Sequence, residues 1–131
     1  MRALAGLALL LPLFAAAAGE GAWQASGPGI TLNYRGQAAS SAPLAAASPA
    51  EGLVTLVAWR YVLNGPTPAG LRVRLCSQSR CVALDAQSGT TRELQNIAAG
   101  EPLRFVWDVP GGGRLIPALK VQSNQVIVNY R

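Results

Sequence analysis

The clearest alternation of apolar and polar residues runs through 53–63. Trp59 and Tyr61 fall on one side of an extended chain, and Arg60 falls on the other. A period of two is typical of a β-strand. The first half is nearly continuous in apolar residues, as expected for a strand covered on both faces. We expect a central strand whose core-facing side consists of Val57, Trp59, Tyr61 and Leu63.

A second alternation, at 71–76, leads through four residues into a third apolar segment at 81–85. The connection 77–80 has hairpin length. One side of the predicted hairpin is apolar, whereas the other carries two cysteines and an opposite-charge pair. If Cys76 faces Cys81, counting back places Leu75 opposite Val82, Arg74 opposite Ala83, Val73 opposite Leu84 and Arg72 opposite Asp85.

The two cysteines, Cys76 and Cys81, are the only ones in the chain. Directly opposed non-hydrogen-bonded positions in an antiparallel pair lie about 4.5 Å apart at Cα, within the span of a disulfide. A redox motif has two residues between its cysteines, and a metal site needs further ligands. We therefore predict a structural disulfide, and an ion pair between Arg72 and Asp85 beside it.

The connection 64–70 is rich in proline and glycine and reads as a stiff loop. If Leu63 paired with Leu71 across it, Arg60 would face Arg74, and like charges there are unfavourable. Either the register is shifted by two residues or the flanking strands belong to different sheets.

Further strand signals occupy the rest of the chain. In the segment 20–35, Gly27-Pro28-Gly29 separates two short predicted strands, one around Trp23 and one over 30–34. Another aromatic-faced alternation covers 103–109, and the glycine run after Pro110 predicts a turn. We also expect a short edge strand at 90–94 and a closing pair of strands at 119–121 and 125–130 around Ser123-Asn124.

Many short strands with regular turn signals, and no convincing helix after the N-terminal segment, predict an all-β fold. We expect a single antiparallel β-sandwich, with a small barrel as the alternative. The predicted core consists of Trp59, Tyr61, Val73, Leu75, Val82, Leu84, Phe105, Trp107, Val126 and Val128.

The N-terminal segment has the pattern of a secretory signal peptide. Arg2 precedes an apolar run too short to span a bilayer, and small residues at A-x-A spacing end at Ala18. We predict a signal peptide at 1–18 and one β domain at 19–131, without a transmembrane segment. Within it, 36–52 is dense in Ala, Ser and Pro, and we expect a mobile surface loop.

The chain carries 11 Lys and Arg against six Asp and Glu, a formal net charge of +5. In an exported protein this favours anionic lipid, cell wall or acidic protein surfaces as partners rather than nucleic acid. Arginines on the outer faces of strands suit contacts to carboxylates of a partner protein, but for any single arginine we favour a solvated face with local ion pairs. A free strand edge is another way to accept a partner.

Catalytic groups are scarce. The chain has no histidine, so neither a Ser-His-Asp nor a Cys-His arrangement can be built. Lys120 is the only lysine and lacks an S-x-x-K motif. We expect no enzyme activity, no cofactor and no metal. The acidic residues are scattered in sequence and comprise Glu20, Glu51, Asp85, Glu93, Glu101 and Asp108.

Three long segments resemble the flagellar protein FlhE family. They are WQASGPGITLNYRGQ at 23–37, LVAWRYVLNGPTPAGLRVRLCSQSRC at 56–81, and RFVWDVPGGGRLIPALKVQSNQVIVNYR at 104–131. The resemblance covers nearly all of the chain after 1–18. It implies a periplasmic accessory protein of bacterial flagella without enzyme activity or cofactor.

Two roles are implied by the resemblance. One is limiting proton leakage through the flagellar type III export apparatus, and the other is chaperoning rod and hook components. The expected partners are therefore flagellar rod or export-apparatus proteins. A general periplasmic protein-binding or inhibitor module unrelated to flagella is the alternative, and a small hydrolase ranks third. No residues are assigned to partner binding.

Overall fold

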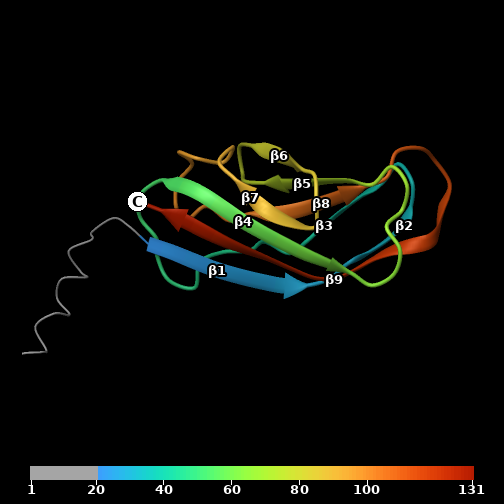
Figure 1. Cartoon of the computed structure of the whole chain (residues 1–131), viewed down its shortest axis with the longest axis horizontal. Helices are drawn as coiled ribbons and strands as arrows, with labels where there is room; N and C mark the ends of the chain where they lie inside the picture. The colour runs from blue at the N-terminus through green and yellow to red at the C-terminus, as the bar shows by residue number, and fades with distance from the viewer. Residues whose placement is uncertain (1–20) are drawn as a thin grey trace, which may run out of the picture.

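The computed structural model describes residues 21–131, which form nine β-strands and no helix. The strands make two antiparallel sheets that face each other, and neither sheet closes into a barrel (Figure 1). The predicted β-sandwich is thus confirmed. The predicted signal peptide at 1–18 lies outside the described residues.

The larger sheet has five strands. Its order is β1 (Gly21–Pro28), β9 (Arg114–Tyr130), β4 (Val54–Leu63) and β7 (Ser88–Thr91), and β2 (Thr31–Tyr34) pairs with the first part of β9. β7 corresponds to the edge strand expected at 90–94, two or three residues earlier.

The smaller sheet has four strands, in the order β3 (Ala38–Ser40), β8 (Arg104–Asp108), β5 (Arg72–Cys76) and β6 (Cys81–Leu84). β4 and β5 therefore belong to different sheets, which was one of the two arrangements expected for the strands around 64–70. In this arrangement Arg60 faces Gln125 and Ser88, while Arg74 faces Val106 and Ala83. The two arginines do not meet.

β9 differs from the predicted closing pair of strands, because it is one continuous strand of 17 residues. Ser123-Asn124 is no turn. The register shifts here instead: Val62 faces Ser123, and Leu63 faces Val121. The side chain of Asn124 is buried and its Nδ2 donates to the carbonyl of Pro28 at 3.0 Å. The polar residues that suggested a turn therefore lie beside a β-bulge within one continuous strand.

The core lies between the two sheets, and all ten residues of the predicted core are buried. At its centre Tyr61 of β4 meets Phe105 and Trp107 of β8 edge-on, with ring centroids 6.0 and 5.8 Å away. Phe105 and Trp107 are stacked at 5.5 Å. Burial raises the pKa of the Tyr61 hydroxyl above its usual 10.0. This aromatic cluster links the larger sheet to the smaller one.

The segment 36–52 holds more structure than its composition predicted. Its residues Ala38–Ser40 form β3 on the edge of the smaller sheet, and Leu44 is buried and bridges to Leu103. Ser41 is buried as well, and its hydroxyl accepts a hydrogen bond from the Phe105 amide at 3.0 Å. Two attachments to the sandwich therefore hold the first half of this segment.

The segment between β7 and β8 covers one end of the sandwich. Its buried residues include Leu94, Ile97 and Ala99. The carbonyl of Ala99 accepts a hydrogen bond from Nε1 of Trp23 at 2.8 Å, which attaches this segment to β1. The core is thereby closed beside the C-terminus.

Candidate interaction surfaces

The hairpin of β5 and β6 has the register that the sequence predicted. Cys76 faces Cys81 with Cα atoms 4.0 Å apart, and the two form a disulfide. The hydroxyl of Ser77 accepts hydrogen bonds from the amides of Ser79 and Arg80, at 3.2 and 3.0 Å. The turn is therefore held by local hydrogen bonds as well as by the covalent link.

Replacing both Cys76 and Cys81 with serine is expected to lower the free energy of unfolding by about 2 kcal/mol and to leave the fold in place, because the closed loop is short. Equilibrium denaturation with urea, compared with the oxidised wild type, measures the loss. A variant that is unfolded at ambient temperature would show that the disulfide does much more than stiffen one hairpin.

The predicted ion pair between Arg72 and Asp85 is corrected by the structure. Arg72 pairs with Asp108, with Nη2 2.5 Å and Nε 3.2 Å from the same carboxylate oxygen. Pairing of β5 with β6 ends at Val73 and Leu84, so Asp85 lies beyond it, whereas Asp108 directly faces Arg72 in β8. The hydrogen bond to Asp108 and the charge of that carboxylate raise the pKa of Arg72.

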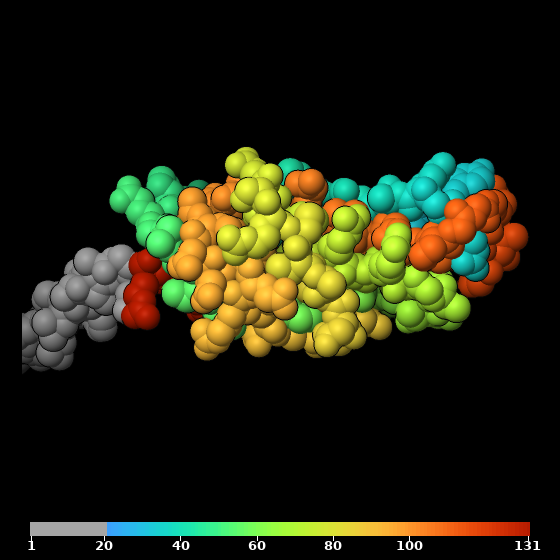
Figure 2. Space-filling model, turned by 90° about the horizontal axis from the view of Figure 1, so that it is seen from above, coloured from blue at the N-terminus to red at the C-terminus, as the bar shows by residue number. Residues whose placement is uncertain are grey.

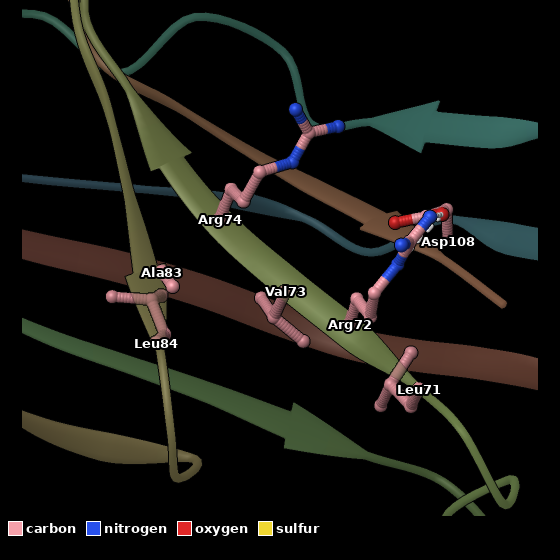
Figure 3. Close-up of a pocket in the computed structure, with 7 residues that line it drawn as sticks. All are labelled: Leu71, Arg72, Val73, Arg74, Ala83, Leu84 and Asp108. Atoms are coloured by element: carbon pink, nitrogen blue, oxygen red, sulfur yellow. Dashed lines mark hydrogen bonds and ion pairs between the residues drawn. The ribbon is translucent and has the colours of Figure 1, made fainter. Parts of the chain in front are cut away.

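This ion pair borders a groove of about 410 Å³ where β5 and β6 diverge (Figure 3). Arg72 and Arg74 extend together from one side of β5, and Val73 lies on the other side. Arg74 is exposed and has no ion pair or hydrogen bond among residues 21–131. At this groove the guanidinium of Arg72 is therefore bound to Asp108, whereas that of Arg74 can bind a group on another molecule. The remaining lining residues are Leu71, Ala83 and Leu84.

The outer face of the smaller sheet is basic beyond the groove. Arg104 faces Cys76 across the β5–β8 ladder and is exposed. Val106, between Arg74 and Ser40 in neighbouring strands, is buried on this face. The planar guanidinium of arginine suits a two-point contact with a carboxylate on a partner protein. We call Arg74 and Arg104 the basic face.

The strand β1 forms an open edge of the larger sheet (Figure 1). It pairs with β9 along its whole length, and in the described chain no strand covers its other side. Its eight residues, GAWQASGP, include no charged side chain, and the final Pro28 is the one feature that usually protects an edge. This edge offers backbone groups to an extended partner segment.

The residues considered for catalysis do not come together. Lys120 is exposed on β9, and Asp108 is occupied by Arg72. Glu101 accepts a hydrogen bond from the amide of Gln78 at 2.8 Å. Glu20 lies outside the described residues. From Gly21 onward, no three His, Cys, Asp or Glu side chains cluster as a metal site would require.

Among residues 21–131, no helix has the length and apolarity needed to cross a bilayer.

The sequence did not reveal the Arg72 and Asp108 pair, because these residues are 36 positions apart and only the order of strands in the sheet brings them together. The same strand order leaves Arg74, beside this pair, without an ion-pair partner in the described chain.

Comparison with known proteins gives one consistent result. A sequence model of the family described as Flagellar protein FlhE matches residues 29–131. Flagellar protein FlhE of Salmonella typhimurium is 76% identical over 123 residues, covering 94% of this chain and 95% of that protein. The Escherichia coli protein of the same name is 72% identical over the same length, and the one from Yersinia enterocolitica is 42% identical over 125 residues, covering 93% and 88%.

A solved structure agrees with the sequence comparisons. A crystal structure described as that of FLHE is 77% identical to this chain and superposes on it with a TM-score of 0.85. The match covers 87% of this chain and 99% of the other.

Proposed function

Since the chain belongs to the flagellar protein FlhE family, we propose that it works in the periplasm as an accessory factor in flagellar assembly and type III export. It limits proton leakage through the export apparatus, chaperones rod and hook components, or does both. The signal peptide predicted at 1–18 and the disulfide support an oxidising compartment outside the cytoplasm.

The observation that carries this proposal is the basic face on the smaller sheet. Arg74 and Arg104 are exposed and have no ion pair within the described chain, whereas Arg72 is neutralised by Asp108. Two guanidinium groups without an internal partner, on neighbouring strands of one sheet face, suit a partner that presents carboxylates. The partner is a flagellar rod or export-apparatus protein, and the role is binding rather than catalysis.

The sealing role predicts a change in cytoplasmic pH. In acid medium, cells that lack this protein are expected to have a lower cytoplasmic pH than wild-type cells, measured with a ratiometric fluorescent reporter. The difference disappears when the export apparatus is also removed, because protons then have no channel to leak through. An unchanged pH in the single deletion contradicts sealing and leaves the chaperone role.

The basic face predicts which substitution weakens partner binding. Arg74→Glu is expected to reduce capture of rod and export-apparatus proteins by the purified chain about tenfold or more, because it places like charge against the partner's carboxylates. Arg60→Glu makes the same charge change on the outer face of β4 and serves as the matched control. Quantitative mass spectrometry of the captured proteins gives the ratio.

Two results would count against this proposal. Equal losses with Arg74→Glu and Arg60→Glu mean that net charge, and not the basic face, governs binding. The alternative of a general periplasmic binding or inhibitor module predicts that the chain captures the same partner from cells that lack flagellar proteins. Capture that is lost in those cells excludes this alternative.

A further inference from the structure

An arm extends from the larger sheet beyond its other strands. Pairing of β9 with β4 ends at Val121, and its pairing with β1 ends at Ser123. Within the described chain, residues 114–119 of β9 therefore pair only with β2. The arm is the part of the larger sheet farthest from the C-terminus (Figure 1), and its cyan and orange-red atoms form the right-hand end of the molecule in Figure 2.

The arm is a folded element and not a loose loop. Its inner residues Leu32, Leu115 and Leu119 are buried. Backbone hydrogen bonds join the end of β2 to the turn before β9: the amide of Arg35 donates to the Gly113 carbonyl at 2.9 Å, and that of Gly36 donates to Val109 at 2.8 Å. The side chains at its surface are therefore held in defined positions.

Two apolar side chains project from this arm into solvent. Ile116 is 78% exposed, more than any other large hydrophobic residue in the described chain, and Tyr34 is 41% exposed. Register places Tyr34 opposite Arg114, and alternation along β9 puts Arg114 and Ile116 on the same side of the strand. Exposed apolar side chains gathered at one end of a molecule mark a contact with something other than water.

The charges around these two side chains have one sign. Arg35, Arg114 and Lys120 lie on the arm, and neither 29–37 nor 109–121 contains an acidic residue. The guanidinium of Arg114 donates to the Tyr34 hydroxyl at 3.0 Å and lies 5.5 Å from the centre of its ring. Lys120 faces Thr31 at the base of the arm, whereas Tyr34 faces Arg114 at its far end. We call Tyr34, Arg35, Arg114 and Ile116 the arm tip.

We propose that the arm tip docks on the surface of a bilayer containing anionic phospholipids. Ile116 and the Tyr34 ring enter the interfacial layer, while Arg35 and Arg114 contact phosphate groups. A specific protein partner needs a complementary surface of about 800 Å². The tip is small and projecting, with two apolar side chains, which suits a fluid surface that adapts to its shape.

The test uses extruded vesicles and the purified chain beginning at residue 19. At low salt the chain sediments with vesicles of phosphatidylglycerol and phosphatidylcholine, but not with vesicles of phosphatidylcholine alone. Binding falls as salt is raised, because the electrostatic part is screened. Arg114→Ala is expected to lower the partition coefficient about fivefold, from the loss of one basic group at the surface.

Ile116→Ser tests the apolar contribution, and a loss of about fivefold or more is expected. The matched control is Leu53→Ser. Leu53 is the other large aliphatic residue that is exposed within residues 21–131, at 48%; it lies just before β4 and bridges to Ala98, away from the arm. Thermal unfolding of each variant shows whether folding is intact, as expected for substitutions at exposed positions.

A second measurement does not depend on loss of binding. Ile116→Cys, labelled with an environment-sensitive fluorophore, is expected to shift its emission to shorter wavelength when anionic vesicles are added, and Leu53→Cys is not. Equal shifts at both positions overturn the proposal, as does unchanged binding of Ile116→Ser and Arg114→Ala. Loss of capture of a flagellar protein by Ile116→Ser, without vesicle binding, would instead make the arm tip a protein interface.

Discussion

Replacing Trp107 with alanine is expected to lower the free energy of unfolding by about 3–5 kcal/mol, the usual cost of removing a large buried aromatic ring. Trp107 is fully buried in β8 and its ring contacts both Tyr61 and Phe105. The substitution therefore leaves a cavity at the point where the two sheets meet. Urea denaturation followed by far-ultraviolet circular dichroism gives the change in stability.

Trp107→Phe is the informative companion. Within the described chain, Nε1 of Trp107 is buried without a hydrogen-bond partner, so phenylalanine removes no hydrogen bond and fills most of the volume. We expect a loss roughly half that of alanine or less. Equal losses in the two variants would mean that the indole N–H is paired in solution, for example with a buried water.

Replacing Gly29 with alanine is expected to cost about 3 kcal/mol or more. A Cβ at this position would lie 1.5 Å from the carbonyl oxygen of Val121 and 2.8 Å from the carbonyl carbon of Gln122. These are backbone atoms of β9, so no rotamer change relieves the clash and the strands must move apart. The amide of Val121 also donates to the Ile30 carbonyl at 2.8 Å, and this contact is strained by the same movement.

Gly112→Ala is the matched control for this substitution. A Cβ there meets nothing within 4 Å. Chemical denaturation of both variants should show a large loss for Gly29→Ala and a change within about 0.5 kcal/mol for Gly112→Ala. A small loss for Gly29→Ala would show that β1 and β2 tolerate separation from the centre of β9.

The predictions that succeeded rest on short-range regularities. The period of two at 53–63 identified β4 and its buried side, because side-chain direction follows directly from strand geometry. The register of the hairpin followed from two cysteines five positions apart. The like-charge conflict between Arg60 and Arg74 correctly limited the arrangement of the strands around 64–70 to two, of which the structure has one.

The predictions that failed depended on contacts between distant residues. Asp85 is the nearest acid to Arg72 in the predicted hairpin, but Asp108 lies opposite it in a strand whose neighbour the sequence could not identify. Ser123-Asn124 has turn composition, yet pairing on both sides holds it inside β9. The Ala-, Ser- and Pro-rich segment 36–52 gave no strand signal, yet it contains β3, because backbone pairing with β8 needs no large side chain.

The candidate surfaces are also products of strand order. The sequence placed arginines on outer strand faces, but it did not show that Asp108 would neutralise Arg72 and leave Arg74 available. Similarly, no local pattern showed that 114–120 would extend past β4 and expose Ile116. Such features become visible only when the neighbours of each strand are known.

The position of β9 has a consequence for the order in which the chain folds. β9 is the last strand along the chain, yet it is the main partner of β1, β2 and β4. When the chain emerges N-terminus first, as it does from a ribosome, these three strands cannot pair with β9 until it has emerged. Contacts so distant in sequence slow folding and delay it until the C-terminal residues arrive. Until β9 is available, β1, β2 and β4 therefore lack the backbone hydrogen bonds that β9 supplies.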